Sequence, residues 1–192
     1  MNQTRVGIRV CLIPATLLAA WLGMQQVHEL GHVLGAHLTG GRVERVVLHP
    51  LSFSRTDLAH NPHPLVVAWA GPIFGALAPL LICLAAERLK LSGAYVLRFF
   101  AGFCLLANGL YLGVGSFDRI GDCGDLVRHG AAIWQLWLFG LATAPLGLWL
   151  WNGLGPKFGL GKNAQDVSRR HLIGVVAVNI ALLASALAVG GG

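Results

Sequence analysis

Five long apolar stretches dominate this sequence and restrict the folds open to it. They lie at residues 10–38, 64–86, 94–117, 131–151 and 172–189. Each is long enough, or nearly so, to cross about 30 Å of hydrocarbon as a helix that rises about 1.5 Å per residue. Charged residues make up 11% of the chain, whereas a soluble domain averages about a quarter. We therefore expect an all-α polytopic membrane protein, with about five transmembrane helices and the lipid bilayer as its solvent.

A polar stretch separates the first two apolar segments and has the character of β-structure. Residues 43–48 and 51–54 are short strand-like runs, separated around His49 and Pro50. This pattern predicts a small β-hairpin at the membrane surface. Because no internal repeat or interdomain linker interrupts the chain, we expect residues 1–192 to form a single integral membrane domain.

The net charge of +6 does not indicate a nucleic-acid partner. Lysines and arginines are distributed among the connections between the apolar segments. Basic residues that flank the spans of membrane proteins have this distribution. The sequence contains no block of basic residues and no RNA-binding motif. We therefore interpret these charges as solvated membrane flanks and expect no nucleic-acid binding.

The motif His28-Glu29-Leu30-Gly31-His32 lies inside the first apolar stretch, where charged and polar side chains are costly. Histidines four residues apart project from nearly the same face of a helix, so both rings can bind one metal ion. Glu29 lies about 100° around the helix from His28, beside that metal. There it can take a proton from a water molecule and return it to a leaving amine. The spacing therefore predicts a zinc (Zn2+) site with His28 and His32 as ligands and Glu29 as the catalytic acid and base.

A catalytic zinc site usually takes a third protein ligand and leaves one position open for water. Of the eight acidic residues, Asp118, Asp122 and Asp125 lie together in one polar turn before the fourth apolar stretch. Gly121 and Gly124 give the backbone around Asp122 the freedom to turn its carboxylate inward. Aspartates of this kind also cap helix N-termini while facing solvent. Because the chain offers few other carboxylates, we favour metal binding by this cluster.

The cysteines and the remaining histidines are weaker candidates. Cys123 adjoins the acidic cluster, and its thiolate would be a zinc ligand, but we expect it to pack as a small apolar side chain. The four cysteines have no metal-finger spacing: Cys11, Cys83, Cys104 and Cys123. The other histidines lie in loops or near span ends, where we expect ordinary surface roles: His37, His49, His60, His63, His129 and His171.

Taken together, these motifs resemble the site-2 protease family, the intramembrane zinc metalloproteases of the M50 type. The resemblance extends from about Leu22 to Leu126. It rests on the histidine motif, on Ala70-Gly71-Pro72 in the next apolar stretch, on the hairpin between them and on an aspartate after a later span. It implies that Asp122 is the third ligand, because Gly124 and Leu126 follow it in the family's register.

The chain departs from the family pattern around this aspartate. Gly121-Asp122-Cys123 stands where the family usually has Leu-Asp-Gly. Asn108 precedes Asp122 by 14 positions with no proline between them, although the family places an asparagine and prolines closer to the aspartate. These differences leave Asp118 and Asp125 open as alternative third ligands.

Two criteria for membrane orientation disagree. With alternating sides, nine lysines and arginines flank the N-terminal side of the spans and five flank the other. This count favours a cytoplasmic N-terminus. The usual arrangement of the family implies an external one.

We therefore predict a zinc-dependent metalloendopeptidase in a multi-pass protein of the cell membrane. Its expected partners are the lipid bilayer and a membrane-embedded peptide or protein substrate, which it cleaves in or near a transmembrane segment. A metal-binding membrane transporter or sensor is an alternative, but it would be supported by repeated metal-binding positions, and the sequence has one cluster. An inactive scaffold with the same fold is another alternative, against which the intact Glu29 argues.

Overall fold

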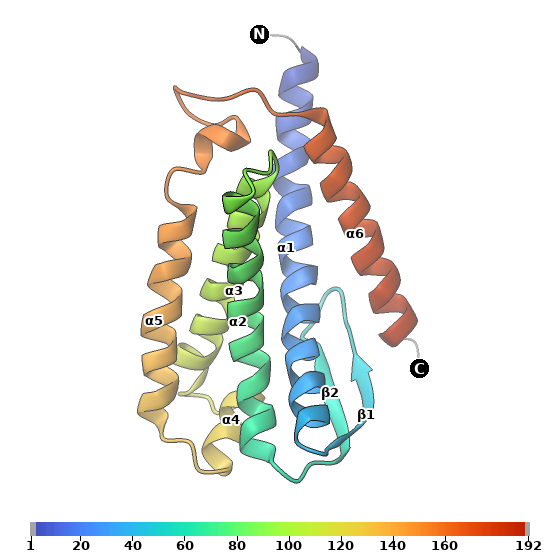
Figure 1. The fold of residues 1–192 in the computed structure, drawn as a ribbon, viewed down its shortest axis with the longest axis vertical. Helices are drawn as coiled ribbons and strands as arrows, with labels where there is room; N and C mark the ends of the chain where they lie inside the picture. The colour runs from blue at the N-terminus through green and yellow to red at the C-terminus, as the bar shows by residue number, and fades with distance from the viewer. Residues whose placement is uncertain (1–2, 191–192) are drawn as a thin grey trace.

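The computed structural model describes residues 3–190, which are mostly helical (Figure 1). The elements follow one another as α1 (Gln3–Leu38), β1 (Arg42–Val47), β2 (Arg55–His60), α2 (Pro64–Arg88), α3 (Ala94–Gly115), α4 (Asp122–Arg128), α5 (Ile133–Trp151), the 3-10 helix η1 (Gly155–Phe158) and α6 (Arg169–Gly190). Five of the described helices are long and apolar enough to cross a membrane: α1, α2, α3, α5 and α6. The expected fold class, a helical membrane protein with a small β-hairpin, is confirmed.

The long helices form a bundle with two different ends (Figure 1). Helix α1 packs against α2 and α6, and α3 packs against both α2 and α5. The β-hairpin and the short helix α4 lie at the same end of the bundle, which we call the hairpin end. Helix α1 begins at the opposite end. Segments that are distant in the sequence therefore meet at the hairpin end.

Helix α1 is longer than the predicted first span. It has 36 residues, so it extends about 54 Å at about 1.5 Å per residue. Because this length exceeds about 30 Å of hydrocarbon, α1 has to tilt or to extend beyond the membrane surface. The other four spans agree closely with the predicted ranges.

The hairpin differs from its prediction in the second strand. Strands β1 and β2 pair antiparallel, with Val46 opposite Thr56. The first strand agrees with the predicted run at residues 43–48, but the prediction of a strand at 51–54 is wrong, because β2 spans Arg55–His60. Residues 51–54 belong instead to the connection between the two strands.

This connection is held against α1, which explains why it does not pair as a strand. The indole Nε1–H of Trp21 donates a hydrogen bond of 2.9 Å to the carbonyl of Pro50. The Gln25 side-chain oxygen accepts hydrogen bonds of 2.9 Å from both the backbone N–H and the hydroxyl of Ser54. Contacts four residues apart on one face of α1 thus fix the hairpin beside the bundle.

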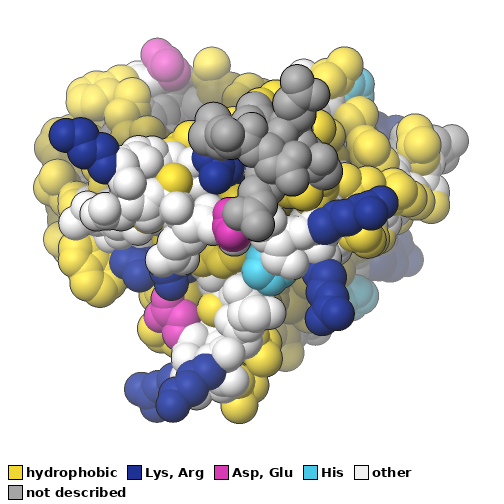
Figure 2. Space-filling model, turned by 90° about the horizontal axis from the view of Figure 1, so that it is seen from above, with side chains coloured by type: hydrophobic (Ala, Val, Ile, Leu, Met, Phe, Trp, Pro, Cys, Tyr) yellow, Lys and Arg dark blue, Asp and Glu magenta, His cyan; other side chains and the backbone are white. Residues whose placement is uncertain are grey.

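Basic side chains lie at the end of the bundle where α1 begins, and hydrophobic side chains project around them (Figure 2). The exposed lysines and arginines near this end come from the end of α2, the α5–α6 connection and the start of α6: Arg88, Lys90, Lys157, Lys162, Arg169 and Arg170. This distribution is typical of a bundle whose sides face lipid and whose ends reach water.

Candidate metal centre

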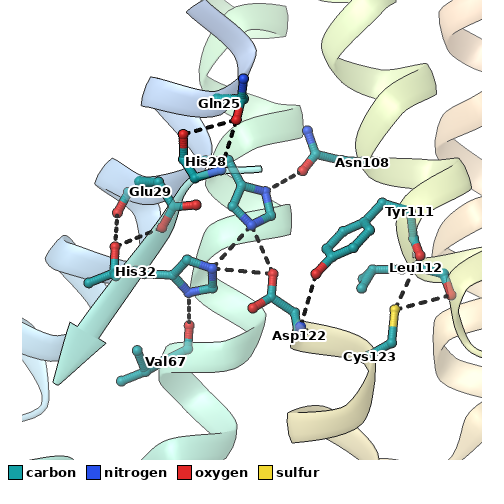
Figure 3. A network of polar contacts seen from close by, with 12 residues as sticks. Gln25, His28, Glu29, His32, Val67, Asn108, Tyr111, Leu112, Asp122 and Cys123 are labelled. Carbon is teal, nitrogen blue, oxygen red and sulfur yellow. Dashed lines mark hydrogen bonds and ion pairs between the residues drawn. The ribbon is translucent and has the colours of Figure 1, made fainter. Parts of the chain in front are cut away.

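Three side chains from two distant segments meet at the hairpin end (Figure 3). His28 and His32 lie one turn apart on α1, and Asp122 is the first residue of α4. Oδ2 of Asp122 lies 2.8 Å from Nε2 of His28 and 3.3 Å from Nε2 of His32. The two Nε2 atoms lie 3.1 Å apart. We call these residues the His-His-Asp group. It is a group of side chains that could hold a metal ion.

The other ring nitrogen of each histidine is held by a hydrogen-bond acceptor. The Asn108 side-chain N–H donates to the carbonyl of Cys104 (2.9 Å), so its Oδ1 faces His28 and accepts from Nδ1–H at 2.7 Å. The carbonyl of Val67 on α2 accepts from Nδ1–H of His32 at 2.8 Å. Both neutral rings therefore present the lone pair of Nε2 to the centre of the group, and such contacts are typical of metal-ligating histidines.

This arrangement leaves acceptor atoms facing one another. Two Nε2 lone pairs and a carboxylate oxygen meet within 3.3 Å, and none of the three can donate a hydrogen bond while Nδ1 carries the ring proton. A positive charge, from a proton or a metal cation, is needed to hold them together. Atoms bound at about 2.0–2.1 Å to a tetrahedral zinc ion lie about 3.3 Å apart. The three separations of 2.8, 3.1 and 3.3 Å come close to this spacing, and imidazole nitrogens and a carboxylate oxygen are ligands that zinc takes, so the residues present fit a zinc ion.

The fold of α4 presents Asp122 to the two histidines. Cys123 and Leu126 are fully buried and pack with Leu112 and Leu136 in one apolar cluster, which fixes α4 beneath α3 and α5. Burial raises the pKa of the Asp122 carboxyl, but hydrogen bonds from His28 and His32 and the positive charge of protonated rings outweigh burial, so that the pKa lies well below its usual range. Asp122 is therefore ionised at neutral pH, as a metal ligand has to be.

The two alternative aspartates lie outside the His-His-Asp group. Asp118 is exposed. The Asp125 carboxylate is also half-exposed and pairs with the guanidinium of Arg128 at 2.7 Å, although Asp125 lies at the margin of the same cleft. Among the described residues, Asp122 is the aspartate that meets both histidines. Its role as the third ligand stays a prediction.

Two glycines allow α1 and α2 to approach each other at this level. A Cβ atom at Gly71 would collide with the ring of His32, and a Cβ at Gly31 would lie 2.9 Å from the Cα of Gly71. Small residues permit such close helix contacts in membranes. The glycine in Ala70-Gly71-Pro72 thus has a specific role, because it makes room for a histidine of the His-His-Asp group.

Glu29 lies in the same cleft as this group and is nearly buried, with 6% of its surface exposed. Its Oε2 atom accepts a hydrogen bond of 2.7 Å from the hydroxyl of Thr56 on β2. The carboxylate is therefore held beside the His-His-Asp group by the hairpin and is not one of its members (Figure 3). This position suits a group that exchanges protons with a water molecule, the role predicted for it.

The cleft has a volume of about 490 Å³ and is formed by α1, β2, α2, α3 and α4. Gln25 lines it together with His28 and Tyr111. Gln26 points elsewhere, because its side-chain N–H donates to the carbonyl of Leu182 on α6 at 2.8 Å. Of the two glutamines that precede the histidine motif, one thus lies at the site and the other joins two helices.

The weaker candidates do not join the group. The Cys123 thiol donates to the backbone carbonyl of Tyr111 at 3.1 Å, and burial, followed by the nearby charge of Asp122, raises its pKa to about 11. It is therefore a protonated, packed side chain. Among residues 3–190, the candidate metal group contains none of the other histidines predicted to have surface roles.

Sequence reasoning missed the residues that support the site. Asn108, the Val67 carbonyl, Thr56 and Tyr111 come from three elements that approach α1 only in the folded chain. A polar residue within an apolar span was the one available signal for Asn108, which is 1% exposed. No sequence pattern indicates a backbone carbonyl as the partner of a histidine.

Replacing Asn108 with leucine should weaken metal binding by about 10–100-fold, because it removes the acceptor that fixes the His28 ring. Competition between the purified protein and a chelator of known zinc affinity measures this change. Asn179→Leu is the matched control, because Asn179 is another buried helical asparagine, bonded to the Val175 carbonyl at 3.1 Å on α6. Equal zinc affinities of the two variants would refute the assigned role of Asn108.

Comparison with known proteins agrees with this geometry. The Peptidase M50B-like family matches residues 6–112. The match extends from α1 through the hairpin and α2 into α3, and it includes His28, Glu29 and His32, whereas Asp122 lies beyond it. No curated protein and no solved structure matches the chain. Because the family match covers more than half of the sequence and confirms the resemblance found in the motifs, the chain belongs to the Peptidase M50B-like family.

Proposed function

We propose that the protein is an intramembrane zinc metalloprotease that hydrolyses peptide bonds in or near transmembrane segments. The observation that carries the proposal is the meeting of His28, His32 and Asp122 in a cleft that also contains Glu29. Two histidines, a carboxylate and a separate glutamate are the side chains that metal-assisted hydrolysis requires. Membership of a peptidase family supports the same reaction.

The proposed division of labour follows from the contacts. A bound zinc ion would lower the pKa of a water molecule in the cleft and polarise the scissile carbonyl. Glu29 takes a proton from the attacking water and then gives it to the leaving amine. The Thr56 hydroxyl holds the Glu29 carboxylate in place from β2. Asn108 and Val67 keep the two histidine rings oriented.

The hairpin suggests how a substrate lies in the cleft. In the two-stranded sheet, β2 pairs with β1 along one of its edges. Four successive residues of β2 line the cleft: Arg55, Thr56, Asp57 and Leu58. An extended peptide can form backbone hydrogen bonds with such an unpaired strand edge. A substrate helix has to unwind first, because its amides are otherwise bonded within the helix. We therefore propose a membrane-embedded peptide or protein substrate that is extended at the cleavage site.

The surroundings of the site also fit a membrane enzyme. Five candidate membrane spans make this a multi-pass membrane protein; we propose that the membrane is the cell membrane and that residues 1–192 act as one domain. Because the site lies at the hairpin end, near the ends of α1 and α2, water can reach it without crossing the whole bilayer.

Removal and return of the metal test this function. Purified protein in liposomes should cleave a reconstituted transmembrane peptide, lose that activity on treatment with a chelator and recover it when zinc is added. Uptake of a metal ion into sealed vesicles without any peptide cleavage would instead favour a transporter. Zinc binding with neither cleavage nor uptake would favour an inactive scaffold.

A further inference from the structure

We propose that Tyr111 is a further catalytic residue, whose hydroxyl donates a hydrogen bond to the oxygen of the scissile carbonyl as negative charge develops there. This role rests on the proposed proteolytic function. It assigns to α3 a direct part in the reaction, beside the contribution of Asn108 to the orientation of His28.

The position of Tyr111 brings its hydroxyl to the His-His-Asp group (Figure 3). The side chain lines the same cleft as His28, Glu29 and Asp122. Its hydroxyl oxygen accepts the backbone N–H of Asp122 at 3.0 Å. Its ring lies edge-on to the ring of His28, with 6.0 Å between the ring centroids. The hydroxyl is thus fixed at the backbone of Asp122, and the tyrosine ring packs beside the ring of His28.

The hydroxyl proton has no acceptor among the described residues. A tyrosine hydroxyl has one proton to donate and can also accept, and the contact with Asp122 uses only an acceptor position. Two neighbouring groups already donate to other acceptors: the Thr56 hydroxyl donates to Glu29, and one N–H of the Asn108 amide donates to the Cys104 carbonyl. A donor that stands free in a cleft beside a candidate metal centre is suited to stabilise developing negative charge.

The backbone before Asp122 is adapted to this hydroxyl. Gly121 has a φ of +60°, a left-handed conformation that favours glycine. A Cβ atom at this position would also collide with the hydroxyl oxygen of Tyr111. Glycine at position 121 therefore serves both the turn into α4 and the close approach of the tyrosine.

The chemical step balances without transfer of the tyrosine proton. The water oxygen bonds to the carbonyl carbon as Glu29 takes its proton, and the π-electron pair of the carbonyl moves to the carbonyl oxygen. Tyr111 stabilises that oxyanion by donating a hydrogen bond. The C=O bond then re-forms, the C–N bond breaks, and the proton held by Glu29 passes to the leaving nitrogen.

The test compares Tyr111→Phe with the wild-type protein in the cleavage assay. Loss of one oxyanion donor should lower kcat by about 10²–10³-fold, with KM and zinc affinity little changed, because Leu126 and Cys123 still anchor α4. Affinity for a phosphinic peptide, whose tetrahedral group imitates the oxyanion, should fall by a similar factor. Tyr95→Phe is the matched control, since the Tyr95 hydroxyl contacts His171, outside this cleft, and it should retain wild-type kcat.

Two results would overturn the proposed role of Tyr111. An unchanged kcat would show that the hydroxyl does not act on the substrate. A fall in kcat matched by an equal fall in zinc affinity would show that Tyr111 only supports Asp122. Absence of cleavage by the wild-type protein itself would instead refute the proposed function, and the catalytic role of Tyr111 with it.

Discussion

Replacing Glu29 with glutamine is expected to lower peptide cleavage by about 10²–10⁴-fold, because the amide cannot take a proton from the attacking water. The amide has nearly the same shape and can still accept the hydrogen bond from Thr56, so the fold should be retained. Because Glu29 is not part of the His-His-Asp group, the variant should still bind one zinc ion per chain. Cleavage of a reconstituted transmembrane peptide and zinc content, measured on the same preparation, test both expectations.

Glu44→Gln is the control for this change. Glu44 is an exposed glutamate on β1, so its replacement alters the charge by the same amount at a distance from the cleft. It should cleave at the wild-type rate. Full activity of Glu29→Gln would rule out Glu29 as the base, and loss of zinc from this variant would mean that Glu29 is a ligand.

Replacing Asp122 with alanine should weaken zinc binding by more than about 100-fold and abolish cleavage. Supporting residues around a metal ligand typically contribute about 10–100-fold in affinity, and a ligand itself should contribute at least as much. The effect should be large because the two histidines would otherwise have to hold the ion alone. Zinc competition with a chelator gives the affinity, and the liposome assay gives the activity.

Asp125→Ala separates this effect from a general disturbance of α4. Asp125 lies three residues further along the same helix and pairs with Arg128 near the cleft margin. Its loss should leave zinc affinity near the wild-type value, because exposed ion pairs contribute little. The opposite ranking, with zinc lost from Asp125→Ala and kept by Asp122→Ala, would assign the third ligand to Asp125.

The membrane architecture could be predicted because it depends on local sequence. A run of about 20 apolar residues specifies a span by its own composition, and four of the five predicted ranges agree closely with the long helices, while α1 begins before its predicted range. The second hairpin strand could not be placed, because the Pro50 carbonyl and the Ser54 N–H bond to Trp21 and Gln25 of α1 and not to a partner strand. Those contacts join positions nearly 30 residues apart.

The residues of the site also fall into two groups: those that local sequence predicts and those that depend on long-range packing. The spacing of His28 and His32 on one helix face follows from helical periodicity alone, and the structure brings both rings together. The sequence favoured Asp122 as the third ligand but left Asp118 and Asp125 open, because the approach of Asp122 to α1 depends on how α4 packs against the other helices. The Val67 carbonyl and Thr56 had no local signal, since each acts through a long-range contact. Asn108 stood out only as a polar residue within an apolar span, which does not identify His28 as its partner.

Zinc K-edge X-ray absorption of the purified wild-type protein tests the central claim most directly. The account predicts one zinc ion per chain, about four-coordinate, with nitrogen and oxygen neighbours at about 2.0–2.1 Å and the scattering pattern of two imidazole rings. The imidazole signal should disappear together with the bound zinc in His28→Ala. A sulfur neighbour at about 2.3 Å, or a wild-type protein that retains no zinc after purification, would contradict it.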